Sequence, residues 1–122
     1  KHITNSRIKN SLYFDKALKN IKEITLPPRY RNAKQVFHIY VIRVKNRKKL
    51  QKYLIQNGID AKIHYPKPMH LQPAAKYLNY KKGDFPISEN ICETVLSLPV
   101  HEFLTRKQLD YVINKIKTFY NE

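Results

Sequence analysis

Two histidines and one tyrosine, His64, Tyr65 and His70, have the residue types and the spacing of a small binding site. They lie in the segment AKIHYPKPMHLQP, which contains three of the chain's seven prolines. Proline fixes its own φ angle and disfavours helix in the residue before it, so this segment should be extended and stiff. Imidazole and phenol groups held in this way can hydrogen-bond phosphate oxygens or hydroxyls with little loss of side-chain entropy. The alternative is that the prolines only stiffen a crossover and that the histidines are structural.

Three other kinds of catalytic chemistry lack their usual signatures. A phosphate-binding loop needs several glycines, and this chain has only Gly58 and Gly83. No G-x-S-x-G elbow presents a hydrolase nucleophile. A Schiff-base lysine needs burial or neighbouring cations to lower its pKa, and only Lys62, on an expected strand, departs from a polar context. We therefore expect no catalytic residue in this chain.

A metal site is the next possibility, because several candidate ligands are present. The sequence has no H-x-x-x-H or C-x-x-C pair, so ligands would have to meet through tertiary structure alone. We expect no metal site. The candidates are His38, His64, His70, Cys92 and His101.

The chain is strongly basic, with 24 Lys and Arg against nine Asp and Glu and a formal net charge of +15. Residues 24–59 hold nine basic side chains and no acidic one. Such a field favours phosphate-bearing partners, including nucleic acid, anionic lipid or a nucleotide-linked small molecule, although lysine can also serve only solubility. A small nucleic-acid-binding domain is therefore the alternative function. Its phosphate contacts would come from Arg43, Lys45, Arg47, Lys48, Lys49 and Lys52, and its stacking faces from Tyr30, Tyr40 or Tyr53.

The length and composition indicate an ordinary globular domain. A chain of 122 residues with 42% apolar residues is long enough to bury a core. The single cysteine, Cys92, cannot form an internal disulfide and is expected to be a buried thiol, so we expect a cytoplasmic protein. No apolar run approaches the roughly 20 residues of a membrane-spanning helix. The start, KHITNSR, has no initiator methionine, and we interpret it as a cut end.

Hydrophobic periodicity predicts an α+β fold, a small, mostly antiparallel sheet packed by helices. One domain is expected over residues 1–122, with a leading helix and a short extended piece in 1–35 and the sheet and remaining helices in 36–122. Thr105 and Gln108 have the spacing of a capping box before the last helix, and Gly58 is suited to end an earlier one. The expected elements are a helix over 8–21, an extended piece at 24–26, strands at 36–44 and 59–65, a helix over 46–58, a short helix from 72, a helix and a brief strand in 87–100, and a helix from 105.

Five motifs together resemble the carboxy-terminal small domain of the DegT-type sugar aminotransferases, which are pyridoxal phosphate (PLP) enzymes of the aspartate aminotransferase fold, fold type I. The resemblance covers nearly the whole chain, and HYPKPMHLQP and LSLP are its most specific parts. The HYP version of the motif is most similar to the branch that acts on deoxythymidine-diphosphate-linked 4-keto or 3-keto-6-deoxy sugars. The motifs are HIYVIR from 38, HYPKPMHLQP from 64, GDFPISE from 83, LSLP from 96 and TRKQ from 105.

The resemblance implies a function for a longer parent protein. Such enzymes work as homodimers and transfer an amino group from glutamate to a keto sugar linked to a nucleoside diphosphate. Their PLP lysine belongs to an amino-terminal large domain that this chain lacks, so the chain alone should be inactive and should not hold PLP. By the same resemblance, His64, Tyr65 and His70 should lie near the nucleotide-sugar site. A third possibility is a free-standing remnant that keeps the fold as an interaction module.

Overall fold

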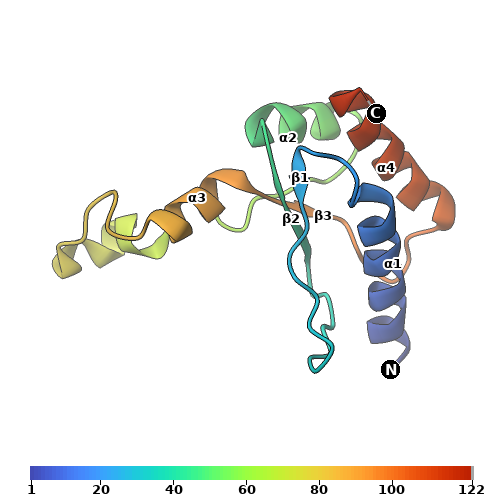
Figure 1. Ribbon diagram of the computed structural model, residues 1–122, viewed down its shortest axis with the longest axis horizontal. Coiled ribbons are helices and arrows are strands. Elements are labelled where there is room, and N and C mark those ends of the chain that lie inside the picture. The colour runs from blue at the N-terminus through green and yellow to red at the C-terminus, as the bar shows by residue number, and fades with distance from the viewer. Residues whose placement is uncertain (122) are drawn as a thin grey trace.

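A three-stranded antiparallel sheet runs through the middle of the computed structural model, which describes residues 1–121, and its strand order is β1-β2-β3. Residue 122, the last of the expected domain, lies outside the described residues. Figure 1 shows α1, α2 and α4 gathered around the sheet, while α3 extends away from it. The elements are α1 His2–Leu18, β1 Ile24–Thr25, β2 Tyr40–Val44, α2 Arg47–Gln56, the 3-10 helices η1 Met69–Leu71 and η2 Pro73–Leu78, α3 Pro86–Thr94, β3 Val95–Leu98 and α4 Arg106–Tyr120.

The central strand β2 directs its side chains alternately, as a pleated strand does. Tyr40, Ile42 and Val44 are buried in the core, whereas Val41 and Arg43 between them are only half-buried. On the neighbouring strand, Leu98 and Leu96 lie opposite Tyr40 and Ile42. These side chains pack with the apolar sides of α1, α2 and α4 into one cluster that includes Phe14, Leu18, Leu50, Leu54 and Ile116. The expected fold class, α+β with a small antiparallel sheet, is confirmed.

The last helix begins where its sequence predicts. The Thr105 hydroxyl accepts a bond from the Gln108 backbone N–H at 3.3 Å, and the Gln108 side chain accepts one from the Thr105 N–H at 2.9 Å. This reciprocal capping box satisfies two backbone donors that the first turn of a helix leaves unpaired. The stripe Leu109, Val112, Ile113 and Ile116 is buried, as expected.

The two expected long strands differ from the observed ones. The first starts at Tyr40 rather than at residue 36, because Phe37 has a φ of +52°, which no strand allows, and the loop before Tyr40 leaves Val36 exposed. The strand expected at 59–65 is wrong. That segment meets the sheet only at an isolated bridge between Lys62 and Ser97, while the alternation that suggested a strand comes from burial of Ala61. The first helix also starts earlier, at His2 rather than at residue 8.

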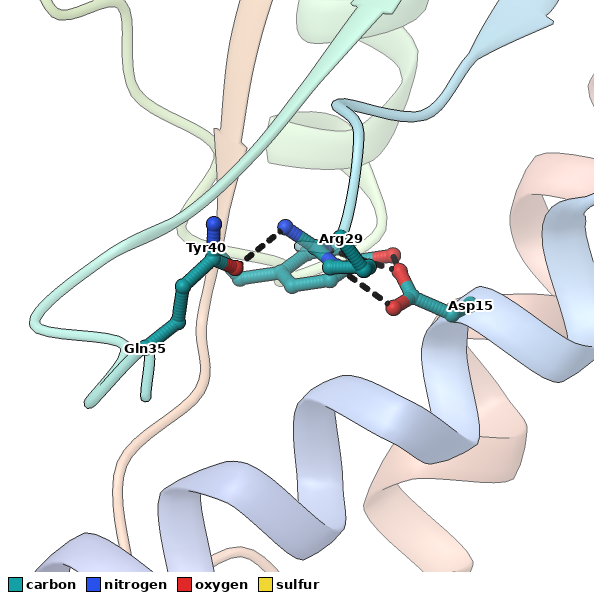
Figure 2. A network of polar contacts seen from close by, with 4 residues as sticks. All are labelled: Asp15, Arg29, Gln35 and Tyr40. Carbon is teal, nitrogen blue, oxygen red and sulfur yellow. Dashed lines mark hydrogen bonds and ion pairs between the residues drawn. The ribbon is translucent and has the colours of Figure 1, made fainter. Parts of the chain in front are cut away.

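The loop between β1 and β2, residues 26–39, is fastened to α1 by a polar network (Figure 2). Arg29 donates two hydrogen bonds to the Asp15 carboxylate, at 2.9 and 3.0 Å, and a third to the Gln35 side chain at 2.8 Å. The buried Tyr40 hydroxyl donates to Asp15 at 2.7 Å. Burial first, and Asp15 second, raise the pKa of Tyr40. One carboxylate thus holds both the loop and the first residue of β2 against α1.

Residues 65–94, called the arm below, project from the rest of the molecule in Figure 1. The arm contains η1, η2 and α3 and rejoins the sheet at β3. Two arginines hold its base: Arg43 Nε donates to Thr94 Oγ1 at 3.0 Å, and Arg47 donates to the carbonyl oxygens of Cys92 and Glu93. Cys92 itself is half-buried, not buried as expected.

Candidate functional site

A pocket of about 190 Å³ lies beside β3, where four separate parts of the chain meet. Arg7 comes from α1, His38 from the loop before β2, Lys62 and His64 from the segment after α2, and His101 from the turn after β3. Asp60 is the acidic residue in this lining, and it pairs with Lys62 at 3.0 Å. The pocket therefore gathers two cationic side chains, Arg7 and Lys62, and three imidazoles beside an apolar remainder, and these groups can donate hydrogen bonds to an anionic group.

His64 is held in this pocket by the bridge to β3. Backbone hydrogen bonds join Lys62 and Ser97 in both directions, at 3.0 and 2.8 Å. His64 Nδ1 then lies 2.9 Å from the hydroxyl of Ser97, a residue only 4% exposed. This bond satisfies a buried hydroxyl and fixes the ring, while none of the described residues binds Nε2. A fixed imidazole with one free ring nitrogen can exchange a hydrogen bond with a ligand.

Tyr65 follows His64 across a cis peptide bond, and its ring stands edge-on to the imidazole with 5.6 Å between the ring centres. Its side chain is 69% exposed and is not part of the pocket lining. His64 and Tyr65 are thus brought together at the start of the arm.

His70 lies elsewhere, inside the arm. Its Nε2 is 3.0 Å from a carboxylate oxygen of Glu89, and its ring packs on Phe85 with 4.8 Å between centres. The same Glu89 oxygen accepts the Gly83 N–H at 2.8 Å. The Gly83 N–H, and after it the His70 ring, hold the pKa of the Glu89 carboxyl below its ordinary value, although burial opposes them. The structure therefore does not bring His70 into the pocket with His64, and it gives His70 an internal partner.

Two residues of the pocket, Arg7 and His101, were not predicted to lie near His64. Arg7 donates to Glu102 at 3.1 Å and to the His38 carbonyl oxygen at 3.2 Å, so α1 positions the residues before β2. His101 follows β3, and its carbonyl oxygen accepts a bond from Asn10 of α1 at 3.0 Å. Arg7 and His101 are 94 positions apart in the sequence, and only packing of α1 against the turn after β3 brings them together.

The lysines and the possible metal ligands of the described residues are not arranged as a cofactor or metal site would require. None of the lysines among residues 1–121 is buried, so none has the desolvated setting of a Schiff-base lysine. In the same residues, no three histidine, cysteine or acidic side chains are grouped as metal ligands would be. Nor does any helix in this part of the chain have the length and apolar character needed to cross a membrane.

The basic segment 24–59 is partly committed to internal contacts. Arg29, Arg43 and Arg47 bind side chains or carbonyl oxygens within the fold. Of the three tyrosines considered for base stacking, Tyr40 is fully buried and Tyr53 is half-buried against the core. Arg43 and Arg47, two of the six predicted phosphate contacts, and Tyr40, one of the three predicted stacking rings, are therefore engaged within the fold.

Comparison with known proteins decides the family. The profile of the DegT/DnrJ/EryC1/StrS aminotransferase family matches residues 1–117. The chain belongs to this family. The resemblance seen in the sequence motifs is therefore confirmed, and the nucleic-acid alternative is not favoured.

Two relatives illustrate the similarity. The erythromycin biosynthesis sensory transduction protein EryC1 of Saccharopolyspora erythraea is 39% identical over 105 residues, which are 86% of this chain and 29% of that protein. The dTDP-3-amino-3,6-dideoxy-alpha-D-galactopyranose transaminase of Aneurinibacillus thermoaerophilus is 36% identical over 104 residues, 84% of this chain and 28% of that protein. The chain thus spans about three tenths of the length of these relatives.

Solved structures agree with the sequence comparison. Streptomyces venezuelae DesV, crystallised with a ketimine intermediate, superposes with a TM-score of 0.93 at 29% identity, covering 98% of this chain and 32% of DesV. A family aminotransferase from Brucella abortus gives a TM-score of 0.88 at 30% identity, with the same coverage. The fold is therefore that of one third of a fold type I sugar aminotransferase.

Proposed function

We propose that this chain is the carboxy-terminal small domain of a PLP-dependent aminotransferase that transfers an amino group from glutamate to a nucleoside-diphosphate-linked keto sugar. Its role is to form one wall of the substrate cleft. The observation that carries the proposal is the placement of His64, fixed on Ser97 in a pocket that also contains Arg7 and Lys62, within a family of aminotransferases.

The chemistry of the pocket supports an anionic, hydroxylated ligand. Arg7, Lys62 and His64 supply hydrogen-bond donors at its lining, and a diphosphate-linked sugar carries both negative oxygens and hydroxyl groups. Tyr65, the first residue of the arm, adds an exposed phenol next to His64. His70 contributes to the proposed wall by holding the arm in shape, since its ring is paired with Glu89.

We infer that PLP is held outside this chain. The lysines of residues 1–121 do not fit a Schiff-base role, because each is exposed or half-buried. The relatives are about three times as long, so the additional part of such a subunit would bind the cofactor. On this proposal the chain alone is inactive, and the complete enzyme is a cytoplasmic homodimer.

The proposed sugar class is supported by the name of one relative. The Aneurinibacillus relative is named for a dTDP-linked 3-amino-3,6-dideoxy sugar. The proposed substrate is accordingly a dTDP-linked keto-deoxy sugar. This class has two negatively charged phosphates, to which Arg7, Lys62 and His64 of the pocket could donate hydrogen bonds.

The test uses the product of the complete reading frame that contains these residues. Turnover of glutamate with dTDP-linked 3-keto and 4-keto sugars is followed by 2-oxoglutarate formation. His64→Ala and Tyr65→Phe should lower kcat/KM for the sugar, and Lys49→Ala, an exposed change on α2, is the matched control. Equal effects of all three would refute the site, and no amino transfer at all would refute the function.

A second measurement tests the cofactor assignment. The 122-residue chain incubated with PLP should develop no stable absorbance of an internal aldimine. Stoichiometric, stable colour would overturn the inference that PLP is held elsewhere.

A further inference from the structure

We propose that Ser97 is a positioning residue that holds the His64 imidazole in the tautomer with its hydrogen on Nε2. In this form His64 donates a hydrogen bond to a phosphate oxygen of the nucleotide sugar and does not accept a proton as a base. The first statement concerns this chain alone, and the second rests on the proposed function. Together they add to that function a residue of β3 and the direction of one hydrogen bond.

The sheet fixes Ser97 from both sides. In β3 it lies opposite Val41 of β2. On the free edge of β3, its N–H donates to the Lys62 carbonyl oxygen at 2.8 Å and its carbonyl oxygen accepts the Lys62 N–H at 3.0 Å. The residue is 4% exposed. The place of its hydroxyl is therefore set by backbone contacts, which a change of the side chain leaves intact.

The Ser97 hydroxyl has one hydrogen-bond partner among the described residues, His64 Nδ1 at 2.9 Å. A neutral imidazole carries one hydrogen, on either Nδ1 or Nε2, and the other nitrogen accepts. If Nδ1 carried it, Nδ1 would donate to Ser97, and the buried hydroxyl hydrogen would have no acceptor, which is costly. If Nδ1 is bare, Ser97 donates to it and both groups are satisfied. The hydrogen-bond network therefore assigns the imidazole hydrogen to Nε2.

The direction of this bond decides what His64 offers a ligand. None of the described residues binds Nε2, so its N–H is available in the pocket that His64 lines. Arg7 and Lys62 line the same pocket and also end in N–H donors, although Asp60 engages one of those of Lys62 at 3.0 Å. Donors that converge in this way match oxygens that only accept hydrogen bonds, as those of a phosphate do.

The tautomer is measured directly by nitrogen NMR on the 122-residue chain. Long-range ¹H–¹⁵N spectra at about pH 9, where imidazoles are neutral, separate a ring nitrogen that carries hydrogen from one that does not. The His64 signals are identified by their loss in His64→Gln. We expect Nδ1 to be bare and Nε2 to carry the hydrogen. The reverse assignment would overturn the proposal, whatever the activity of the complete enzyme.

A pair of serine variants tests whether Ser97 is responsible. Ser97→Ala should shift the Nδ1 signal of His64, because it removes the donor, whereas Ser97→Thr, which keeps a hydroxyl, should leave that signal nearly in place. Ser11→Ala is the matched control, since Ser11 is also buried but its hydroxyl has no partner among the described residues. It should change neither nitrogen of His64. Identical His64 signals in Ser97→Ala and wild-type protein would overturn the role of Ser97.

In the product of the complete reading frame, kinetics separate a donor from a base. Ser97→Ala should raise KM for the dTDP-linked keto sugar about fivefold and leave kcat and its pH profile unchanged. His64→Gln, whose amide nitrogen can take the place of Nε2, should keep more affinity than His64→Asn, whose amide reaches only as far as Nδ1. A lower kcat with unchanged KM, or a lost limb of the pH profile, would indicate a base and overturn the donor role.

Inhibition by dTDP, which carries the diphosphate without the sugar, tests the acceptor. The inhibition constant should rise in Ser97→Ala by about the same factor as KM. An unchanged inhibition constant beside a raised KM would overturn the phosphate as acceptor and leave the roles of Ser97 and His64 standing. The expected His64 signals in a protein without amino transfer would refute the proposed function and support the role of Ser97.

Discussion

Replacing Arg47 with methionine should weaken the attachment of the arm to the body of the protein, which Arg43 also holds. Arg47 is only 9% exposed, and its guanidinium donates to the carbonyl oxygens of Glu93 at 3.1 Å and Cys92 at 3.2 Å. These carbonyls are at the end of α3, where a helix leaves its last acceptors unpaired. Arg47 itself is the first residue of α2, a place where a positive charge opposes the helix dipole. Arg47 therefore stabilises the fold by capping the carbonyl end of α3, and not by its position in α2.

The expected loss of stability can be worked out from these contacts. A hydrogen bond from a charged donor contributes about 1.5–3 kcal/mol. Two such bonds are lost, but Glu93 is exposed, so water can replace part of what its carbonyl loses. Removing a positive charge from the first turn of α2 also returns about 0.3–1 kcal/mol. The net cost for Arg47→Met should be about 2 kcal/mol.

Lys48→Met is the matched control for this measurement. It removes the same charge from the same helical turn and introduces the same side chain, but Lys48 is exposed and caps nothing. Urea unfolding gives the global free energy of unfolding, and amide hydrogen exchange in α3 reports local opening of the arm. Exchange in α3 should be faster for Arg47→Met than for Lys48→Met. If the free energies of opening of Arg47→Met and Lys48→Met differ by less than about 0.5 kcal/mol by both methods, the capping argument is refuted.

Three further outcomes follow from other contacts. Tyr40→Phe removes the hydroxyl that donates to Asp15 at 2.7 Å, so it should lower the free energy of unfolding in urea by about 1–2 kcal/mol. An unchanged urea midpoint would contradict this. The pKa of Glu89 is lowered in the folded state, so its contribution to stability is present above the unfolded value of about 4.3 and is lost as the pH falls through the folded-state pKa. Amide NMR signals of residues 83–89 should therefore shift in acid, and Glu89→Gln should remove the transition. Gly58 has a φ of +73°, so Gly58→Ala should cost about 1 kcal/mol in the same urea assay even though a Cβ would meet no neighbour.

The start of α4 and the end of α2 could be predicted because each is specified locally, whereas no local signal marked the start of α1 at His2. The stripe of α4 repeats with helical spacing, and its start is marked by Thr105 and Gln108, whose contacts are only three residues apart. Gly58 likewise ends its helix through its own backbone angle. Signals of this kind need no knowledge of the rest of the fold, and they were reliable here.

The sheet was harder to predict because an alternation of apolar and polar residues indicates alternating burial and does not show that the segment pairs with a strand. Ala61 is buried and Lys62 is exposed, as in a strand, yet the segment pairs with β3 only at Lys62. Because the backbone is left-handed at Phe37, β2 begins only at Tyr40. No residue type in this stretch indicates the left-handed conformation. Strand limits depend on partners that are distant in sequence, so single-sequence periodicity places them poorly.

The candidate site shows the same division between local and distant information. The prolines singled out this segment, but residues 69–71 form a 3-10 helix instead of the expected extended chain, and prolines alone cannot say what each side chain will meet. His64 reaches the pocket because Lys62 bridges to Ser97, 35 residues further along. His70 meets Glu89 instead, an acid that follows the glycine turn of the arm. The same rigid segment therefore presents one imidazole to a pocket and uses the other to hold the arm, and the arrangement of acids and hydroxyls elsewhere in the chain decides between these roles. If the proposed function is correct, His64→Ala should therefore affect sugar binding directly, whereas a change at His70 should act through the shape of the arm.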